Sequence, residues 1–302
     1  MGKEVREPFG IIMSWRTVVI SNRCKLDFKM GFMVVRGEET KRVFLDEIAI
    51  LLIENPAVSF TGCLLDELVK KKIRVIFCDE KRSPVAELSP YYGSYDCSRK
   101  IKMQMDWNDD IKGTVWAEII SEKIRNQSAF LDELQKERES ELLRSYLNQI
   151  EEYDATNREG HAAKVYFNAI FGMDFTRSAD NVTNAALNYG YSLILSAFNR
   201  EITACGYLTQ LGLFHCNTFN QFNLSCDLME PFRVLVDRRV YAEKFVVFST
   251  NEKYKLLALL NDSIYIGEST QTVLNGIKIY CHSVFDALNE GDLSLIKFYK
   301  LI

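Results

Sequence analysis

The pattern of hydrophobic and polar residues changes near residue 90, and the change predicts two differently built parts. From residue 17 to residue 88, short runs rich in Val, Ile and Phe are separated by turn residues, as in strands and hairpins. We expect strands at 17–20, 25–29, 32–36, 42–45, 48–53 and 73–77, and an edge strand at 84–88. One helix is expected after Ser59, where leucines recur at helical spacing up to the basic residues 70–72.

Beyond the stretch Pro-Tyr-Tyr-Gly-Ser at 90–94, hydrophobic residues recur with the period of amphipathic helices. We expect helices at 98–106, 109–127, 130–148, 158–171, 179–204 and 227–244, and at 251–289 with at least one break. The predicted fold class is therefore α+β: a small β-rich N-terminal domain of sandwich-like sheets with one helix, then a larger all-α domain. The predicted divisions are an N-terminal extension at 1–12, the β-rich domain at 13–90, a linker at 91–97 and the helical domain at 98–302.

Composition restricts the partners and the compartment. The chain has 302 residues, 47% of them hydrophobic and 26% charged, which is typical of a globular protein. Its net charge of -4 gives no overall indication of nucleic acid, so a polyanion site would have to come from local basic clusters, which are more often solvated surface. Eight cysteines without a Cys-x-x-Cys pair favour neither a disulfide framework nor a zinc ribbon. With no apolar run of about 18 residues and a charged N-terminus, we expect a cytoplasmic protein without membrane attachment.

One imidazole, His215, precedes two carboxylates, Asp227 and Glu230, which stand three residues apart at the start of a predicted helix. That spacing places both acids on one helix face, and a mixed imidazole and carboxylate site suits Mg²⁺ or Mn²⁺. Asp227 could instead be an N-cap with Glu230 as its capping-box partner, although Pro231 disfavours the regular helix that such a box serves. A zinc site with the neighbouring cysteines 216 and 226 lacks a fourth ligand.

Glu159 is a third candidate ligand, near the first turn of the helix expected at 158–171. An acid at this position could also simply favour the helix dipole. Gly160 supports the ligand interpretation, because a glycine in a helix costs roughly 1 kcal/mol relative to alanine and allows close approach of a backbone or ligand. The other histidines are poorer candidates, since His161 points to a different side of the helix and His282 stands alone.

Three asparagines, Asn181, Asn184 and Asn188, follow Arg177 and form a stripe that leads to Tyr191. Asparagine is a mediocre helix former, so several on one face indicate a surface used for hydrogen bonding. Such groups suit phosphate and sugar contacts, and a hydrogen-bonded helix interface is the equally open alternative.

Four motifs in order resemble those of the CRISPR-associated protein one family, the adaptation endonuclease and integrase. They are Glu159-Gly160-x-x-Ala163-x-x-Tyr166-Phe167, Asn184-x-x-x-x-x-Gly190-Tyr191, Gly212-Leu213-Phe214-His215 and Asp227-Leu228-x-Glu230-x-Phe232-Arg233. The resemblance covers Met13 to Ile302, includes the two-part layout, and its start at Met-Ser-Trp-Arg looks like the type II branch.

The resemblance implies a set of site residues. The family's metal ligands correspond to Glu159, His215 and Glu230, with Asp227 as an acidic neighbour and Mg²⁺ or Mn²⁺ as the cofactor. Many members carry Asp where this chain has Glu230. We expect contacts to nucleic acid from six residues of the helical part: Lys164, Arg177, Asn181, Asn184, Tyr191 and Arg233.

The activity implied by the resemblance is insertion of foreign DNA fragments into a CRISPR array by 3′-OH transesterification, in antiviral defence. Water in place of the 3′-OH would make the same site an endonuclease. The implied partners are double-stranded DNA fragments, CRISPR repeat DNA, a second copy of the chain, and a dimer of CRISPR-associated protein two. The type II branch adds an effector nuclease and a ring-shaped accessory protein. Two alternatives stay open, a non-catalytic helical DNA- or protein-binding scaffold and an unrelated metal-dependent phosphodiesterase.

Overall fold

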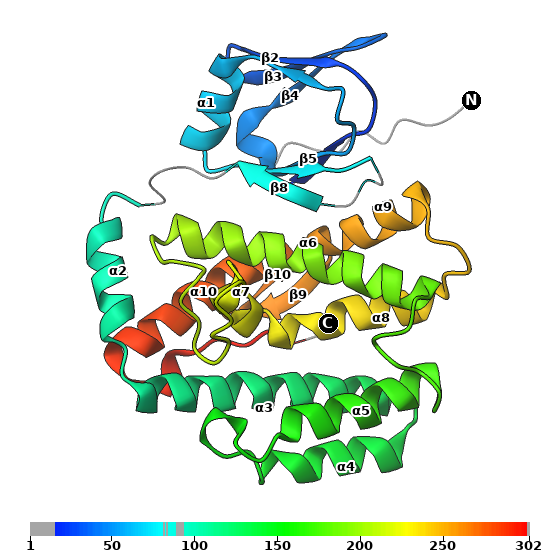
Figure 1. Cartoon of the computed structure of the whole chain (residues 1–302), viewed down its shortest axis with the longest axis vertical. Coiled ribbons are helices and arrows are strands. Elements are labelled where there is room, and N and C mark those ends of the chain that lie inside the picture. Colours follow the sequence, from blue (N-terminus) through cyan, green and yellow to red (C-terminus); the bar gives the residue numbers. More distant parts are fainter. Residues whose placement is uncertain (1–15, 81, 83, 89–93, 301–302) are drawn as a thin grey trace. The chain divides into compact units, whose positions relative to one another are not determined.

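The computed structural model describes residues 16–80, 82, 84–88 and 94–300 (Figure 1). The chain divides into two compact units, Met1–Ser89 and Pro90–Ile302. The predicted extension at 1–12 and residues 91–93 of the predicted linker lie outside the described residues, so the domain limits stay predictions.

The first unit is built from two four-stranded sheets. One has the order β1-β5-β7-β8 and contains Arg16–Ile20, Ile48–Ile53, Arg74–Cys78 and Pro84–Leu88, of which only the last strand runs antiparallel to its neighbour. The other has the order β4-β3-β2-β6 and contains Thr40–Phe44, Phe32–Arg36, Lys25–Lys29 and Ser59–Phe60. Alternating side chains of these strands and of helix α1 (Gly62–Lys70) form one apolar core.

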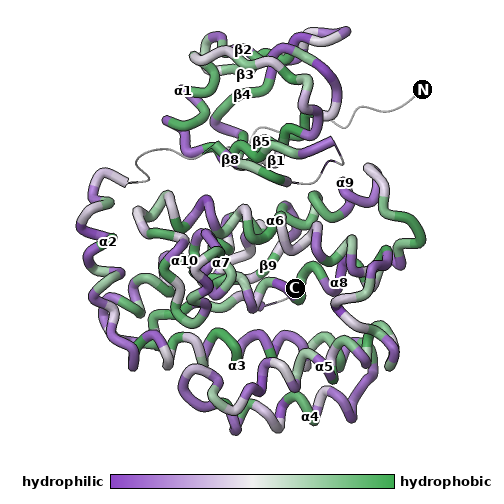
Figure 2. Tube along the Cα trace, viewed as in Figure 1, coloured by the Kyte–Doolittle hydropathy of each residue, from purple (hydrophilic) through white to green (hydrophobic). Residues whose placement is uncertain are grey.

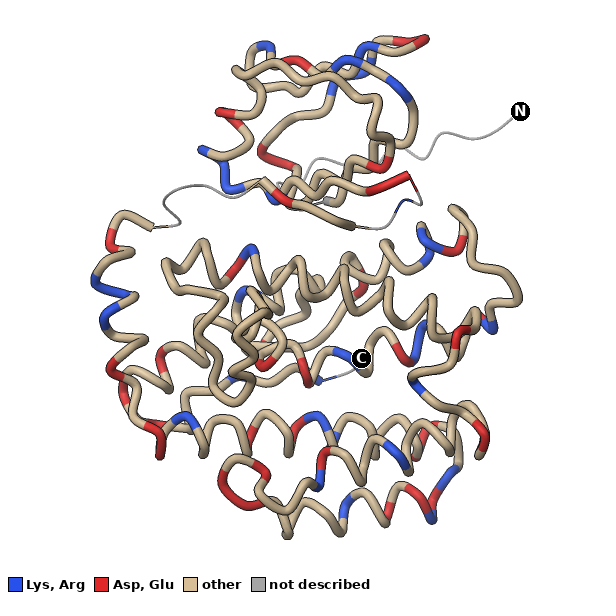
Figure 3. Tube along the Cα trace, in the orientation of Figure 1, with Lys and Arg blue, Asp and Glu red and all other residues tan. Residues whose placement is uncertain are grey.

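The second unit is mostly helical. Its helices are α2 (Cys97–Asp106), α3 (Asp109–Glu133), α4 (Glu137–Leu147), α5 (Arg158–Phe171), α6 (Val182–Ala204), α7 (Asn223–Leu228), α8 (Arg233–Glu243), α9 (Thr250–Ala258) and α10 (Val273–Glu290). Helices α3, α4 and α5 pack side by side, and α6 packs against α8, α9 and α10 (Figure 1). Hydrophobic and hydrophilic residues alternate along these helices (Figure 2), and α3 to α5 carry both signs of charge (Figure 3).

The fold class is confirmed, with several local differences. Helix α3 continues to Glu133 instead of ending at residue 127, and the break comes at Gln135, which has a left-handed backbone with φ 57°. Strand β4 begins at residue 40 rather than 42. The helix expected at 251–289 is interrupted by a hairpin, so the second unit is not all-α.

That hairpin consists of β9 (Ser263–Ile266) and β10 (Ser269–Thr272), joined by two residues with positive φ, Gly267 and Glu268. Two consecutive left-handed residues are typical of a tight hairpin turn. Isoleucines 264 and 266 are buried while their neighbours are exposed, which is the alternation of a half-buried strand. No helix of the described residues is both long and apolar enough to cross a membrane.

Candidate active site

His215 is held in a tight turn by the carboxylate of Asp227. One carboxylate oxygen accepts hydrogen bonds from the backbone N–H groups of Leu213, at 2.6 Å, and Phe214, at 3.1 Å. The other accepts from the backbone N–H of His215 at 3.2 Å and lies 2.5 Å from ring atom Nδ1. Gly212 permits the turn, because a Cβ there would lie 2.3 Å from the carbonyl oxygen of His215.

This turn fixes which nitrogen of His215 is available. A carboxylate can only accept, so Nδ1 carries the proton and Nε2 is the free ring nitrogen. The hydrogen bond to Asp227 raises the pKa of His215, whereas burial raises the pKa of Asp227 against that same bond. The imidazole also meets two stacked aromatic rings edge-on, those of Trp116 and Phe214, whose centroids are 4.7 Å apart.

Asp227 does not begin a helix, so its interpretation as an N-cap is wrong. It lies near the end of α7, whose N-cap position is Phe222. Both of its oxygens are engaged by the turn at 213–215, which makes it the orienting partner of His215 in this structure.

Glu230 lies in a 3₁₀ turn, η3 (Glu230–Phe232), between α7 and α8. The predicted helix at 227–244 is thus interrupted, as Pro231 leads one to expect. The carbonyl oxygen of Pro231 accepts hydrogen bonds from the hydroxyl of Tyr299, at 2.9 Å, and the amide of Asn126, at 3.3 Å. The turn that carries Glu230 is therefore fixed from two other parts of the unit.

Glu159 lies in the first turn of α5, directly after a bend with left-handed residues at 153, 154 and 157. Asp154 caps the helix, since its carboxylate accepts from two backbone N–H groups, including that of Glu159 at 2.9 Å. A Cβ on Gly160 would lie 2.7 Å from the amide oxygen of Asn157. The glycine therefore makes room for that side chain, and the approach of a ligand at this position stays a prediction.

The three predicted ligands line one cavity of about 280 Å³. Its lining residues come from four helices, the loop before α6, the turn η3 and the His215 turn: Lys123, Gln127, Glu159, Phe167, Arg177, Tyr191, His215, Glu230, Arg233 and Asp237. Residues far apart in the sequence thus meet around a single space.

Two cations balance the two glutamates of this cavity. The ammonium of Lys123 lies 2.6 Å from Glu159 Oε1 and 2.5 Å from Glu230 Oε2. Arg233 Nε lies 2.8 Å from Glu230 Oε1. Burial would raise the pKa of Glu230, but the charges of Arg233 and Lys123 outweigh it, and the pKa is lowered. Burial likewise opposes the charge of Lys123, yet the two glutamates hold its pKa above the usual value.

No group of three or more His, Cys, Asp or Glu side chains is arranged to hold a metal ion in the part of the chain that the structure describes. The chemistry of the cavity nevertheless fits a divalent cation. Glu159 and Glu230 already converge on one positive charge, and two carboxylates with a neutral imidazole are donors that Mg²⁺ and Mn²⁺ accept.

The asparagine stripe is a hydrogen-bonded network between α6 and the loop before it. Asn181 caps α6 and accepts from the N–H of Asn184 at 2.8 Å. Asn184 is buried and donates to two loop carbonyls at 2.8 Å each. Arg177 donates to Asn184 and, at 2.7 Å, to Asn188. The interface alternative describes this stripe better than a surface for phosphate contacts.

The remaining residues expected to contact nucleic acid differ in exposure. Tyr191 is buried, and its hydroxyl donates to Asp237. The guanidinium groups of Arg177 and Arg233 lie 5.3 Å and 4.7 Å from the centroid of the Tyr191 ring and face the cavity. Lys164 is exposed on α5. Contacts of these residues to nucleic acid stay predictions.

Two buried charged groups of the cavity, Lys123 and Asp237, were not among the residues expected from the sequence. Burial raises the pKa of Asp237 to about 6, against the hydrogen bond from the hydroxyl of Tyr191. Lys123 follows Trp116 at i+7 in a stripe of buried positions on α3. A lysine at a buried position of such a stripe indicates a nearby acidic partner, because lysine is almost never buried without one.

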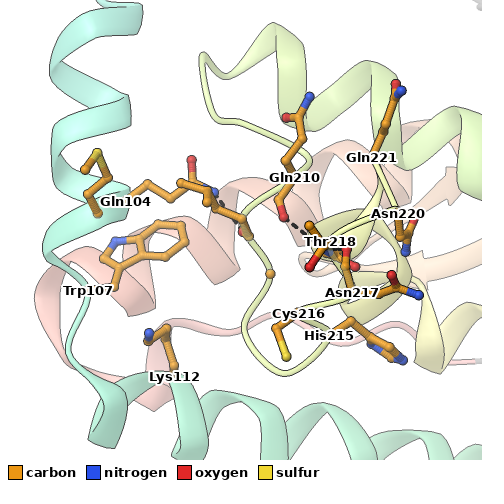
Figure 4. Close-up of a pocket in the computed structure, with 14 residues that line it drawn as sticks. Gln104, Trp107, Lys112, Gln210, His215, Cys216, Asn217, Thr218, Asn220 and Gln221 are labelled. Atoms are coloured by element: carbon orange, nitrogen blue, oxygen red, sulfur yellow. Dashed lines mark hydrogen bonds between the residues drawn. The ribbon is translucent and has the colours of Figure 1, made fainter.

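A second cavity, of about 490 Å³, also includes His215 in its lining. Figure 4 shows carboxamide and hydroxyl side chains of the loop at 210–221 across from Gln104 and Trp107. The side-chain amide of Gln104 connects α2 to the start of this loop, because it donates hydrogen bonds to the carbonyl oxygens of Leu208, at 2.9 Å, and Leu211, at 3.0 Å.

Comparisons with known proteins agree on one family. The family model of CRISPR associated protein Cas1 matches residues 17–244. The CRISPR-associated endonuclease Cas1 of Neisseria meningitidis serogroup C (strain 8013) is 35% identical over 229 residues, which are 76% of this chain and 75% of that protein.

Solved structures share the fold. A casposase bound to integration product superposes with a TM-score of 0.74 at 18% identity, over 96% of this chain and 92% of that one. The structure of a Cas6-RT-Cas1--Cas2 complex matches with a TM-score of 0.73 at 14% identity over 96% of this chain, which spans 37% of that longer chain.

Proposed function

Because the chain belongs to the family of CRISPR associated protein Cas1, we propose that it is a metal-dependent DNA endonuclease and integrase. It inserts foreign DNA fragments into a CRISPR array by attack of a fragment's 3′-OH on a phosphodiester bond of repeat DNA. The observation that carries the proposal is the meeting of Glu159, His215 and Glu230 around one cavity. The relative from Neisseria meningitidis is named an endonuclease, which supports the activity.

Glu159, His215 through Nε2, and Glu230 are the residues that would hold Mg²⁺ or Mn²⁺. When bound, such an ion polarises a phosphate and lowers the pKa of an attacking hydroxyl. Asp227 serves this site by keeping the proton of His215 on Nδ1, so that Nε2 presents a lone pair to the cavity. The orientation of the ring is fixed before any ligand arrives, because the backbone of the same turn is bound to the same carboxylate.

The positive groups of the cavity would orient the DNA backbone. Arg177 and Arg233 face the cavity, and guanidinium groups match the geometry of phosphate oxygens. In this proposal Asn184 and Tyr191 act on DNA indirectly, since one binds Arg177 and the other lies under both guanidinium groups. Asn181 supports this arrangement by capping α6, and Lys164 offers an exposed charge for a more distant phosphate.

The second cavity beside His215, of about 490 Å³, would hold nucleotides next to the reacting phosphate. Carboxamides both donate and accept hydrogen bonds, as the edges of unpaired bases require. The side chains of Gln210, Asn217, Asn220 and Gln221 line this cavity, and the indole of Trp107 adds an aromatic wall. Bases of a DNA end could therefore be bound on one side of His215 while a phosphate lies on the other.

The proposed assembly contains two copies of the chain beside a dimer of CRISPR-associated protein two, with DNA fragments and repeat DNA as substrates. The shared fold with a chain of a Cas6-RT-Cas1--Cas2 complex supports the partner. Participation of a type II effector nuclease and a ring-shaped accessory protein, and a cytoplasmic location, complete the proposal.

The test is cleavage and joining of branched DNA with Mn²⁺ or Mg²⁺. We expect Glu159→Ala and His215→Ala each to lower both rates at least about a hundredfold, while Glu118→Ala on the exposed face of α3 leaves them unchanged. Unchanged rates in both site variants would contradict the enzyme proposal and favour the scaffold alternative. With a fragment that lacks its 3′-OH, the repeat DNA should still be cleaved by water but not joined to the fragment. Hydrolysis of small phosphodiesters that DNA does not inhibit would favour the phosphodiesterase alternative.

A further inference from the structure

Lys123 has an unusual position for a lysine. It comes from the middle of α3, and only 8% of its side chain is exposed. Its ammonium bridges Glu159 and Glu230, which stand 36 and 107 positions away in the sequence. A buried lysine needs such partners, because an isolated charge in the interior is costly.

The charges around Lys123 are balanced without any further ion. Glu159 and Glu230 carry two negative charges, and Lys123 and Arg233 carry two positive ones. The ammonium of Lys123 binds one oxygen of each glutamate, and both glutamates line the same cavity. A divalent cation bound there would compete with this ammonium for lone pairs and would be repelled by its charge.

We propose that Lys123 is a built-in counter-ion that competes with the divalent cation for Glu159 and Glu230. This role rests on the proposed function, which places the cation at those two residues. Lys123 keeps the two carboxylates together when no ion is bound and lowers the affinity for the ion. Because a DNA phosphate is another partner for the flexible ammonium, binding of DNA releases the carboxylates and strengthens binding of the ion.

The same helix provides a matched control. Arg125 also bridges two glutamates, Glu118 at 2.9 Å and Glu122 at 3.1 Å, but 45% of its side chain is exposed. Solvent screens the pair with Glu118, whose side chain is 35% exposed, more than the pair with Glu122, whose side chain is 13% exposed. Removing the charge of Arg125 therefore tests the loss of a bridging cation on α3 away from the cavity.

The experiment measures Mn²⁺ affinity by calorimetry in the full chain and its variants without DNA. We expect Lys123→Met to bind Mn²⁺ at least about tenfold more tightly than the unaltered protein, and Arg125→Met to stay within about twofold. Without Mn²⁺, Lys123→Met should melt roughly 6 °C or more below the unaltered protein, because buried Glu230 and half-buried Glu159 lose the cation that bridges them, and Mn²⁺ should restore most of that loss. Addition of fragment DNA should strengthen Mn²⁺ binding by the unaltered protein more than by Lys123→Met.

Two further variants distinguish failure of the counter-ion role from failure of the proposed metal site. Lys123→Gln retains hydrogen-bond donors without the charge, so it tests the same expectation if the methionine variant does not fold. Equal or weaker Mn²⁺ binding by both Lys123 variants overturns the counter-ion role. Glu159→Gln tests the site itself: Mn²⁺ binding that does not depend on Glu159 overturns the proposed metal site, whereas binding that depends on Glu159 but not on Lys123 overturns only the counter-ion role.

Discussion

The two units bury charged side chains in different ways. In the first unit, Arg74 of β7 pairs with Glu87 of the adjacent strand β8, and the core cluster beside them is apolar. In the second unit, Lys123, Glu230 and Asp237 are buried around a cavity, with partners from several helices. Strand pairing brings the first pair together locally, whereas the second group forms only when distant segments have packed.

This difference distinguishes a charge pair that serves only the structure from a cluster of charges that serves a function. A buried ion pair adds little net stability, since the cost of removing both charges from water offsets their attraction. A cluster of four or more such groups around a cavity is therefore poorly explained by stability alone. Perturbed carboxylates in a cavity are, by contrast, common where a protein binds ions or performs catalysis.

The largest expected effect is the loss of activity in Glu230→Gln. The neutral amide removes a negative donor from the proposed metal site, and we expect DNA cleavage and joining to fall at least about a thousandfold. Glu87→Gln removes the partly exposed partner of buried Arg74 in the first unit, and it should leave the rates of folded protein unchanged. Single-turnover rates measure both, and equal losses in the two variants would erase the distinction between the units.

Asp227→Ala is expected to lower the free energy of unfolding by about 3 kcal/mol. It removes an acceptor of four hydrogen bonds and leaves the N–H groups of the turn at 213–215 unsatisfied. Urea unfolding measures the loss, and Asp227→Asn should lose less because its amide oxygen can still accept. The pKa of His215, followed by NMR, should fall in Asp227→Ala, since the bond that raises it is absent. Undiminished stability together with an unmoved His215 pKa would contradict the orienting role.

Asp237→Asn is expected to change how stability depends on pH. The pKa of Asp237 is raised from 3.8 to about 6 by burial, so its protonated form stabilises the fold below about pH 4 and that contribution disappears as pH rises through 6. The difference in unfolding free energy between Asp237→Asn and the unaltered protein should shift in favour of the variant by about 2 kcal/mol between pH 4 and pH 8. Parallel profiles from urea unfolding at pH 4.5, 6 and 8 would show that Asp237 does not titrate in this range.

The smallest effect is expected for the double variant Arg74→Met/Glu87→Leu. Replacing both members of a buried pair by apolar residues of similar size is often neutral, so unfolding free energy should stay within about 1 kcal/mol of the unaltered protein. DNA cleavage and joining should also be retained. A large loss of stability here, by chemical denaturation, would mean that the pair in the first unit is more than a local contact between strands.

The first unit was largely predictable because its signals are local. Strands β2, β3 and β5 were expected with the ends that the structure has, since hydrophobic runs and turn residues alternate within a few positions. Helix α5 was expected at 158–171 for the same kind of reason, with regular apolar spacing between clear ends.

The missed elements depend on competing or distant signals. The alternation of Ile264 and Ile266 spans only four residues inside a stretch with helical spacing, so the longer pattern prevailed. Glu159, His215 and Glu230 were predicted as ligands through their motifs, and all three line the same cavity, although their binding of a metal stays a prediction. The sequence could not identify the bridging of Lys123, because its partners are far away along the chain. The role of Asp227 was equally hidden, since only the folded turn decides which donors its oxygens meet.

The segment that follows α10 supports the turn that carries Glu230, and it does so from outside the cavity. Tyr299 supports the carbonyl of Pro231, its ring packs on Phe232, and the next residue, Lys300, exchanges backbone hydrogen bonds with Tyr265 of β9. A binding protein or an engineered crosslink that pulls this segment away from the hairpin would withdraw that support. The position of Glu230 could in this way be changed by a molecule that binds the segment after α10, without any inhibitor in the active site.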